Sequence, residues 1–274
     1  MLGSSGDDDR AIAANLDVLV AAKPEVMLDN GAELVERLVA SGDHPAGATE
    51  ETTSGAFTLR GRLAGKVPFP VIVINDSPLK AIVENKHGVG QSVIETIRLA
   101  TNTMLQGRRL VVLGYGWCGR GIARYGRAAG ADVVVVEPDA IKALEAAIDG
   151  FAVRDLHDEL DRGDVYVTAT GHDAVVTIDH IAQMKDDALL ANAGHFDTEI
   201  DVAGLRQVAV GVSPRGPDIR RDRLPSGKAI DLIAEGRMVN LAVTGAAGTR
   251  SRSWTSASVS RRCRWNASRS IRAA

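Results

Sequence analysis

The sequence predicts an α/β protein built around a mostly parallel sheet. Three observations support this: strand-like and helix-like segments alternate, one glycine-rich loop joins an apolar strand directly to a helix, and aromatic residues make up only 4% of the chain. Alternating strands and helices favour parallel pairing with helices on both faces of the sheet. Because aromatic residues are sparse, Val, Ala, Leu and Ile must build the core, which suits α/β packing.

The N-terminal third predicts a small α/β region. Apolar residues at helical spacing indicate helices over 11–22 and 32–40. Between them, residues 26–28 have the pattern of a short buried strand that delivers the polar run DNG to a loop. After the turn-rich run HPAGATEETTSG, the segment FPVIVIND predicts another strand that also ends in polar residues.

The remainder of the chain predicts a long helix and then a larger sheet. Apolar spacing favours a helix over 90–105, followed by a βαβ unit in the run RRLVVLGYGWCGRGIARYGRAAGADVVVVEPD. Further strands are expected at DVYVTAT, DALLANAG, RQVAVGVS and KAIDLIA, with IDHIAQM as a short helix.

The glycine-rich loop has the spacing of a dinucleotide-binding turn. Gly114, Gly116 and Gly119 follow the apolar strand 110–113 and open a helix, so backbone N–H groups and the helix dipole would face an anion. The next strand ends at Glu137, about 20 residues on, where a carboxylate can bind both ribose hydroxyls and repel a 2′-phosphate. The pattern therefore favours NAD over NADP. The alternative is an ordinary glycine turn.

Composition narrows the remaining choices. No run approaches the roughly 20 apolar residues that a membrane-spanning helix needs, and the acidic first ten residues are unlike a secretory leader, so we expect a cytoplasmic protein without a membrane partner. Cys118 and Cys263 predict neither a disulfide framework nor a metal site. The net charge is −3, but residues 250–274 carry seven Arg and no acid, which leaves −10 upstream and no nucleic-acid surface there.

Five ordered segments resemble the signature segments of S-adenosylhomocysteine hydrolases. They are EETTSG, NDSPLKAIVENKHG, LGYGWCGRG, MKDDALLANAGHFDTEID and LIAEGRMVNLA, and the resemblance runs from about residue 24 to about 248. It implies a Rossmann-type doubly wound parallel sheet with a truncated second α/β region, the remnant of a substrate domain. We expect this remnant over 1–88, the NAD-binding domain over 89–244 and an aberrant Arg/Ser-rich tail over 245–274.

The activity that the resemblance implies is the NAD-dependent, reversible hydrolysis of S-adenosyl-L-homocysteine to adenosine and homocysteine. In the family, transient oxidation of the ribose 3′-hydroxyl acidifies the 4′-hydrogen, so homocysteine leaves by elimination before water adds and the cofactor returns its hydride. A thioether sulfur is a poor leaving group until a neighbouring ketone stabilises the carbanion. NAD supplies that electronic change, and the protein supplies geometry and proton transfers.

The resemblance assigns catalytic roles in the segment NDSPLKAIVENKHG. Lys80 would help remove the 3′-hydroxyl proton, Glu84 would bind the ribose hydroxyls, and Asn85 would orient the lysine on the nicotinamide side. If this turn is helical, Lys80 and Glu84 share one face. The alternative is a solvated i,i+4 ion pair.

Other residues are assigned by similarity to the substrate or the cofactor. Glu51 would bind the nucleoside and His195 would lie near the ribose and nicotinamide. The alternatives are an ordinary polar turn or helix start at EETTSG and a structural role for His195. Asn240 would bind the nicotinamide carboxamide, or else cap a helix. The expected cofactor-binding residues are Thr52, Thr53, Ser54, Asn85, Gly114, Gly116, Trp117, Cys118, Gly119, Arg120, Gly121, Glu137, Lys142, Ala193, Gly194, His195 and Asn240. Arg120 and Lys142 could attract phosphate or be solvated helix residues.

The chain departs from the family pattern at several points. Asn30 stands where the family has an acid that handles a proton, and Glu84 replaces an aspartate. Both ends look incomplete. A one-base shift of a GC-rich back-translation from Gly248 reads GHPIEVMDLSVGVQAL and restores a family segment, so we expect a frameshift there. The competing interpretation of this tail is a genuine Arg/Ser arm that binds nucleic acid.

Two further functions stay open beside the hydrolase. One is a catalytically degenerate NAD-binding relative, and the other is an NAD-dependent dehydrogenase of a small substrate, which would rest on fold alone. The family implies a homo-oligomer and a small nucleoside thioether as substrate. No metal is expected.

Overall fold

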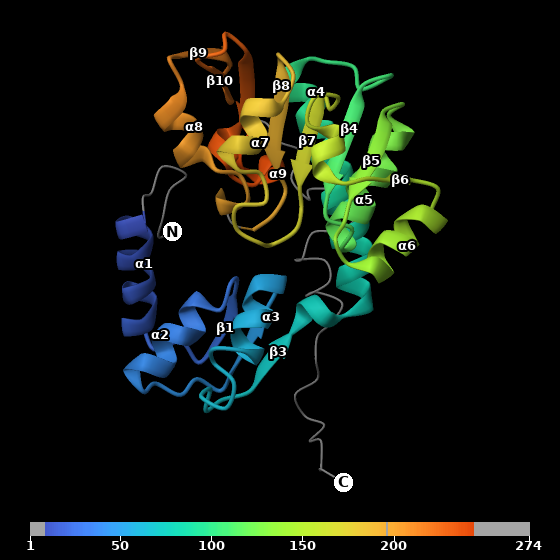
Figure 1. Cartoon of the computed structure of the whole chain (residues 1–274). Helices are drawn as coiled ribbons and strands as arrows, with labels where there is room; N and C mark the ends of the chain where they lie inside the picture. The colour runs from blue at the N-terminus through green and yellow to red at the C-terminus, as the bar shows by residue number, and fades with distance from the viewer. Residues whose placement is uncertain (1–8, 196, 244–274) are drawn as a thin grey trace. The chain divides into compact units, whose positions relative to one another are not determined.

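The computed structural model describes residues 9–195 and 197–243, which fall into two units, Met1–Ala81 and Ile82–Ala274 (Figure 1). The expected tail over 245–274 and the expected frameshift at Gly248 lie outside the described residues. No helix in the described ranges is long and apolar enough to cross a membrane.

The first unit contains a three-stranded parallel sheet with the order β1-β2-β3. Its strands are β1 (Val26–Asp29), β2 (Gly47–Glu50) and β3 (Val71–Val73), and its helices are α1 (Asp9–Ala21), α2 (Glu33–Ser41) and α3 (Thr53–Arg60), with a 3₁₀ turn at Ile74–Asp76. Helix α2 buries Leu34, Val35 and Leu38 against the sheet, because these apolar residues recur at helical spacing. The predicted helices over 11–22 and 32–40 and the predicted strands are therefore present. Strand β2, however, lies in the run HPAGATEETTSG, which the sequence predicted to be rich in turns.

The prediction that residues 26–28 are buried is wrong. Met27 packs with Ala48 and Val71 in the core of this unit, and the register aligns these three residues across the sheet. Val26 and Leu28 point to the other face and are exposed. Side chains alternate along a strand, and the described core cluster of this unit includes Met27 but neither Val26 nor Leu28, so the apolar run is only half buried.

The second unit contains an eight-stranded sheet with the order β6-β5-β4-β7-β8-β11-β10-β9. The first six strands in this order pair in parallel, and β10 pairs antiparallel with β11 and with β9. The strands are β4 (Arg109–Leu113), β5 (Asp132–Val136), β6 (Ala152–Val153), β7 (Val165–Thr168), β8 (Ala188–Asn192), β9 (Gly211–Gly216), β10 (Ile219–Arg223) and β11 (Ala229–Ile233). This arrangement confirms the Rossmann-type prediction, because the chain order reverses on either side of β4.

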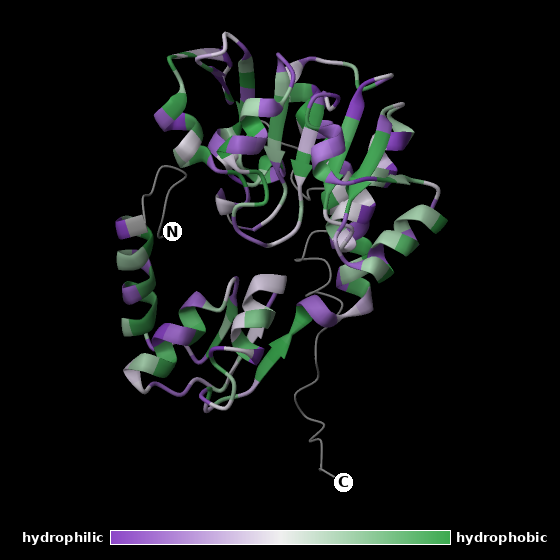
Figure 2. Cartoon of the chain, in the orientation of Figure 1, coloured by the Kyte–Doolittle hydropathy of each residue, from purple (hydrophilic) through white to green (hydrophobic). Residues whose placement is uncertain are grey.

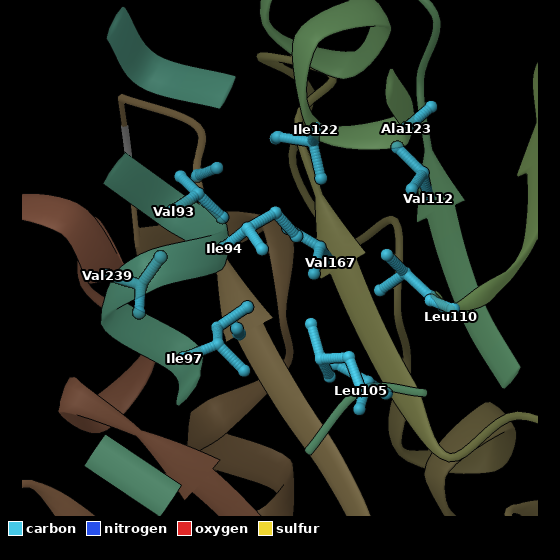
Figure 3. Close-up of a cluster of buried hydrophobic side chains, with 14 of the residues drawn as sticks. Val93, Ile94, Ile97, Leu105, Leu110, Val112, Ile122, Ala123, Val167 and Val239 are labelled. Carbon is cyan, nitrogen blue, oxygen red and sulfur yellow. The ribbon is translucent and has the colours of Figure 1, made fainter. Parts of the chain in front are cut away.

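Helices connect and cover these strands. They are α4 (Gly90–Thr101), α5 (Trp117–Ala128), α6 (Ala140–Ile148), α7 (Ile178–Gln183), α8 (Val202–Val208) and α9 (Val239–Ala242), with 3₁₀ turns at Leu156–Glu159, Asp197–Glu199 and Ala234–Gly236. Strands β4 and β5 are hydrophobic over most of their length (Figure 2), as expected for strands buried on both faces. Between α4 and the sheet, Ile94, Ile97, Leu110 and Val167 form part of one apolar core (Figure 3).

Two boundaries differ from the predictions. The helix expected over 90–105 ends at Thr101, because Asn102 adopts a left-handed conformation with φ 50°. The expected strand RQVAVGVS is helical over residues 206–208, where α8 ends, and joins a strand only from Gly211. Helix α8 begins before this run, with the Asp201 side chain accepting a hydrogen bond from the Gly204 N–H at 2.8 Å. A side-chain cap and a buried Leu205 outweigh the preference of its valines for a strand.

Residues Lys80–Val89 form a π-helix that leads into α4. Its i→i+5 hydrogen bonding is rare in proteins and is found frequently at functional sites. The boundary between the two units falls inside this element, after Ala81.

Candidate functional site

The glycine-rich loop lies between β4 and α5, at the carboxyl edge of the parallel strands. Gly114 has φ +97°, and a Cβ there would lie only 2.8 Å from the Ala169 carbonyl oxygen. A Cβ at Gly119 would collide with the Gly114 carbonyl oxygen. The fold therefore requires both glycines. At Gly116, by contrast, a Cβ would have no atom within 4 Å among the described residues, so this position leaves space above the N-terminus of a 12-residue helix.

Gly121 has a different environment from the other loop glycines. A Cβ at this position would collide with the carbonyl oxygen of Lys86 and lie 3.1 Å from the Gly90 Cα. Helix α5 and the end of the π-helix thus cross at backbone distance. The absence of a side chain at Gly121 serves this close packing.

The acid at the end of β5 contacts the glycine loop. The Glu137 carboxylate accepts hydrogen bonds from the Tyr115 N–H at 2.6 Å and the Asp139 N–H at 3.0 Å. The parallel register aligns Leu113 with Val136, so the loop after each strand emerges at the same edge. The structure therefore brings together the two features that the sequence predicted as one dinucleotide site.

Basic residues near this loop differ in how far they are solvated. The Arg120 side chain pairs with Glu145 at 2.5 Å and stacks on Trp117, 4.9 Å from the ring centroid. With 17% of its side chain exposed, the alternative of a solvated Arg120 is wrong. Lys142 is exposed in the first turn of α6, and Cys118 is half-buried in the first turn of α5.

The loops after β7 and β8 are held by a hydrogen-bonded network. The Asn192 Oδ1 accepts hydrogen bonds from the Thr168 hydroxyl at 2.9 Å and the Gly194 N–H at 2.7 Å. Its Nδ2 donates to the Gly236 carbonyl at 2.9 Å. Asn192 is completely buried. Ala193 and Gly194 are also buried, whereas His195 is exposed. This network fixes the strand end from which His195 projects.

Sequence reasoning missed Glu199, which is 1% exposed. Its carboxylate accepts hydrogen bonds from the Thr170 N–H at 3.0 Å, the Thr170 hydroxyl at 2.9 Å and the Gly171 N–H at 2.8 Å. It therefore holds the loop after β7 beside the glycine loop. Its sequence neighbours Asp197 and Asp201 are also acidic, so the sequence held no signal that this carboxylate alone is buried under loops.

Asn240 lies in α9 and is 1% exposed. Its Nδ2 donates to the Ser92 hydroxyl at 3.1 Å, and its Oδ1 has no hydrogen-bond partner among the described residues. Met238 forms a parallel bridge with Asn192, which places α9 just beyond the end of β8. The predicted nicotinamide-binding amide thus lies at the same sheet edge as the glycine loop, with an acceptor that the described part of the chain leaves unpaired.

In the first unit, several predicted site residues lie just after the ends of the parallel strands. Asp29 aligns with Glu50, and Glu50 with Val73, so Asn30, Glu51 and the 3₁₀ turn after β3 all follow at one edge. The Thr52 hydroxyl and the Ser54 hydroxyl lie 3.0 Å apart. Thr53 hydrogen-bonds to Asn75 at 3.4 Å, and Glu51 is half-buried.

Two carboxylates at this edge are buried, and sequence reasoning missed the role of both. Glu50 is fully buried and accepts hydrogen bonds from the Ala32 N–H at 2.9 Å and the Thr52 N–H at 2.7 Å. Asp29 accepts from the Val35 N–H at 2.8 Å, and burial raises the pKa of its carboxyl above the ordinary value despite this bond. Asn30, at the position of the family's acid, is exposed.

The catalytic candidates of the segment NDSPLKAIVENKHG all lie on the π-helix. Lys80 and Glu84 are half-buried, and Asn85 is 7% exposed. The structure thus places all three residues on one element, in which Lys80 and Glu84 are partly shielded from solvent.

These features define a class: a Rossmann-type α/β protein with a dinucleotide-binding edge at β4, β5, β7 and β8. Residues 85–246 match the family model of the S-adenosyl-L-homocysteine hydrolase NAD binding domain. The chain belongs to the S-adenosyl-L-homocysteine hydrolase family, and NAD is the cofactor of the matched domain.

Curated relatives agree with this assignment. The chain is 43% identical over 243 residues to an S-inosyl-L-homocysteine hydrolase of Methanopyrus kandleri, covering 86% of this chain and 57% of the relative. It is 42% identical over 242 residues to an adenosylhomocysteinase of Thermococcus kodakarensis, covering 86% of this chain and 58% of the relative. The chain thus spans a little over half the length of these relatives.

Solved structures share the fold alone. A phosphoglycerate oxidoreductase from Vibrio cholerae is 19% identical with a TM-score of 0.51, over 70% of this chain and 68% of that one. A putative D-3-phosphoglycerate dehydrogenase from Ralstonia solanacearum is 18% identical with a TM-score of 0.51, over 70% of this chain and 66% of that one.

The residues present fit NAD. Gly116 leaves space at a helix N-terminus for a pyrophosphate, and the Glu137 carboxylate stands beside that loop. The Asn240 oxygen is a buried acceptor without a partner in the described residues, which is costly unless a ligand donor pairs with it.

Proposed function

We propose that this chain is an adenosylhomocysteinase-like enzyme, which reversibly cleaves S-adenosyl-L-homocysteine to adenosine and homocysteine using NAD and a transient oxidation at the ribose 3′-position. The observation that carries the proposal is the family match over residues 85–246, together with relatives named adenosylhomocysteinase. Bound NAD would accept a hydride and return it within one turnover, so net hydrolysis would accumulate no NADH.

On the cofactor side, the proposal assigns binding to residues at the carboxyl edge of the second unit. The N–H groups near Gly116 would bind the pyrophosphate, Glu137 the ribose hydroxyls and Asn240 the nicotinamide carboxamide. The buried Asn192 network and Glu199 would keep the neighbouring loops in place without touching the substrate. A site held in this way needs little reorganisation when the cofactor binds.

On the substrate side, the proposal assigns Lys80 to the proton of the 3′-hydroxyl and Glu84 to the ribose hydroxyls. The position of Lys80 supports this role, because it is half-buried and lies on the same π-helix as Glu84. Asn85 would orient Lys80, and Glu51 would bind the nucleoside base. We propose that Thr52, Thr53 and Ser54 bind NAD, and that His195 acts near the ribose and the nicotinamide.

A second candidate is a catalytically degenerate NAD-binding relative, and one observation favours it. Asn30 stands where the family has a proton-handling acid, and its amide cannot accept a proton. The longer Glu84 would also displace a carboxylate that must be positioned closely. In that case the chain would bind NAD without cleaving a thioether.

One experiment separates these candidates. The purified chain is supplied with NAD and incubated with S-adenosyl-L-homocysteine or S-inosyl-L-homocysteine, while a thiol reagent traps homocysteine and absorbance follows NADH. Released thiol without NADH supports the hydrolase, and the preferred substrate identifies the base. Bound NAD without thiol release would overturn the hydrolase and leave the degenerate relative. Net NADH would instead indicate a dehydrogenase. A Lys80→Met variant is the control for the thiol signal.

Location and assembly are also proposals. The widely separated cysteines predict no disulfide framework, which supports a cytoplasmic protein. The family resemblance supports a homo-oligomer, which sedimentation of the purified chain would test.

A further inference from the structure

The buried amide of Asn240 is hydrogen-bonded to a serine on helix α4. Asn240 Nδ2 donates to the Ser92 Oγ at 3.1 Å, and the Ser92 hydroxyl in turn donates to the Val89 carbonyl at 3.1 Å. Ser92 is 2% exposed and Asn240 is 1% exposed, so water does not compete for these groups. Helix α4 and α9 pack together through Val93, Ile97 and Val239 (Figure 3), which keeps the serine and the amide at hydrogen-bond distance.

The direction of these two hydrogen bonds fixes the orientation of the amide. A serine hydroxyl has one hydrogen, and here the Val89 carbonyl accepts it. Toward Asn240 the serine oxygen can only accept, so it selects the N–H₂ end of the amide. The reversed amide would place two oxygens against each other without a hydrogen between them. The Asn240 Oδ1 is therefore the atom left for a ligand, and it has no partner in the described part of the chain.

From this geometry we propose that Ser92 is a positioning residue that makes Asn240 a hydrogen-bond acceptor, and thereby makes the site select a nicotinamide carboxamide over the corresponding carboxylic acid. The inference rests on the proposed NAD site at Asn240. A carboxamide N–H₂ donates to the fixed oxygen. A carboxylate offers only acceptors, so its negative charge would face the Asn240 oxygen with no hydrogen between them.

Thr96 provides a matched control on the same helix. It lies one turn after Ser92, is fully buried, and its hydroxyl has no hydrogen-bond partner among the described residues. Thr96→Val removes a buried hydroxyl from α4, as Ser92→Ala does, but it removes no hydrogen bond to Asn240. Any effect of Ser92→Ala that Thr96→Val lacks comes from the contact with the amide.

The test is calorimetric titration with two probes, NAD⁺ and nicotinic acid adenine dinucleotide, in which a carboxylate replaces the carboxamide. For the wild-type chain, NAD⁺ should bind about tenfold or more tightly than the acid, as expected when one buried hydrogen bond is lost. Ser92→Ala should weaken the binding of NAD⁺ and lower the ratio of the two affinities several-fold, whereas Thr96→Val should leave this ratio unchanged. Ser92→Thr retains the hydroxyl and should restore most of the ratio.

Two results would overturn the inference while leaving NAD binding intact. They are an equal affinity of the wild-type chain for both probes, and an unchanged ratio in a folded Ser92→Ala. The comparison of the two probes on the wild-type chain needs no variant, so it tests the inference even if Ser92→Ala does not fold. If the wild-type chain bound neither probe, the proposed NAD site itself would fail and this inference with it.

Discussion

Gly116→Ala separates the binding role of the glycine loop from its structural role. Gly116 has φ −71° and ψ −170°, an extended conformation that alanine also adopts, and a Cβ there meets no described atom within 4 Å. Replacing glycine by alanine in such a conformation stabilises a protein by about 0.4–1 kcal/mol. The variant should therefore fold at least as well as the wild-type chain. Its new methyl group would, however, occupy the space through which the pyrophosphate approaches the backbone.

Gly116→Ala should weaken the binding of NAD⁺. Forcing one methyl group into an occupied contact typically costs about 1–3 kcal/mol, which corresponds to a Kd raised about 5- to 150-fold. Calorimetric titration with NAD⁺ measures this change, and urea denaturation of the same preparations measures stability. If Gly116→Ala bound NAD⁺ as the wild-type chain does while remaining folded, this loop would not be the pyrophosphate site. If Gly116→Ala were less stable than the wild-type chain, the conclusion that a Cβ fits at this position would be wrong.

Three further predictions concern packing, buried charge and pH. Gly121→Ala should lower the free energy of unfolding by about 1–3 kcal/mol in urea, because its Cβ collides with the π-helix backbone. Glu199→Gln should lower the free energy of unfolding by about 1–3 kcal/mol, because the N–H₂ end of the new amide would face a backbone N–H donor. The control Glu95→Gln on α4 should lower it by less than about 0.5 kcal/mol. Burial, and then the charge of His157, lowers the pKa of His180 below its ordinary 6.5. The stability from its neutral ring is therefore present above pH 6.5 and lost as pH falls through the lowered pKa. His157→Ala should raise that pKa in an NMR titration and reduce the acid loss; an unchanged titration would exclude the contribution of His157.

Local patterns were sufficient to predict the βαβ unit and its loop. The spacing of Gly114, Gly116 and Gly119 after an apolar strand, with an acid at the end of the next strand, depends only on neighbours in sequence. The structure then places Glu137 against the loop, as that pattern requires. Helix α8 was missed because its cap at Asp201 competes with an apolar run that also suits a strand.

Contacts between distant segments could not be predicted from the sequence. Whether Arg120 is solvated depends on Glu145, which lies 25 residues away in another helix. The exposure of Val26 and Leu28 depends on which face of β1 the helices cover. The orientation of the Asn240 amide depends on Ser92, 148 residues earlier in the chain. In each case the residue type was visible in the sequence, but its partner was not.

The pair Glu50 and Glu51 shows why candidate acids are difficult to rank by sequence. The two residues are adjacent at the end of β2, and side chains alternate there, so they face different surroundings. Glu50 is fully buried and accepts N–H groups from the loops that follow β1 and β2, while Glu51 stays half-buried at the edge. Glu199 does the same for the loop after β7 in the second unit. A carboxylate enclosed by backbone donors already has its hydrogen bonds satisfied, so it can position a loop but has little capacity left for a ligand. Glu50 therefore holds the turn that follows β2, and the proposed function assigns the nucleoside to its neighbour Glu51.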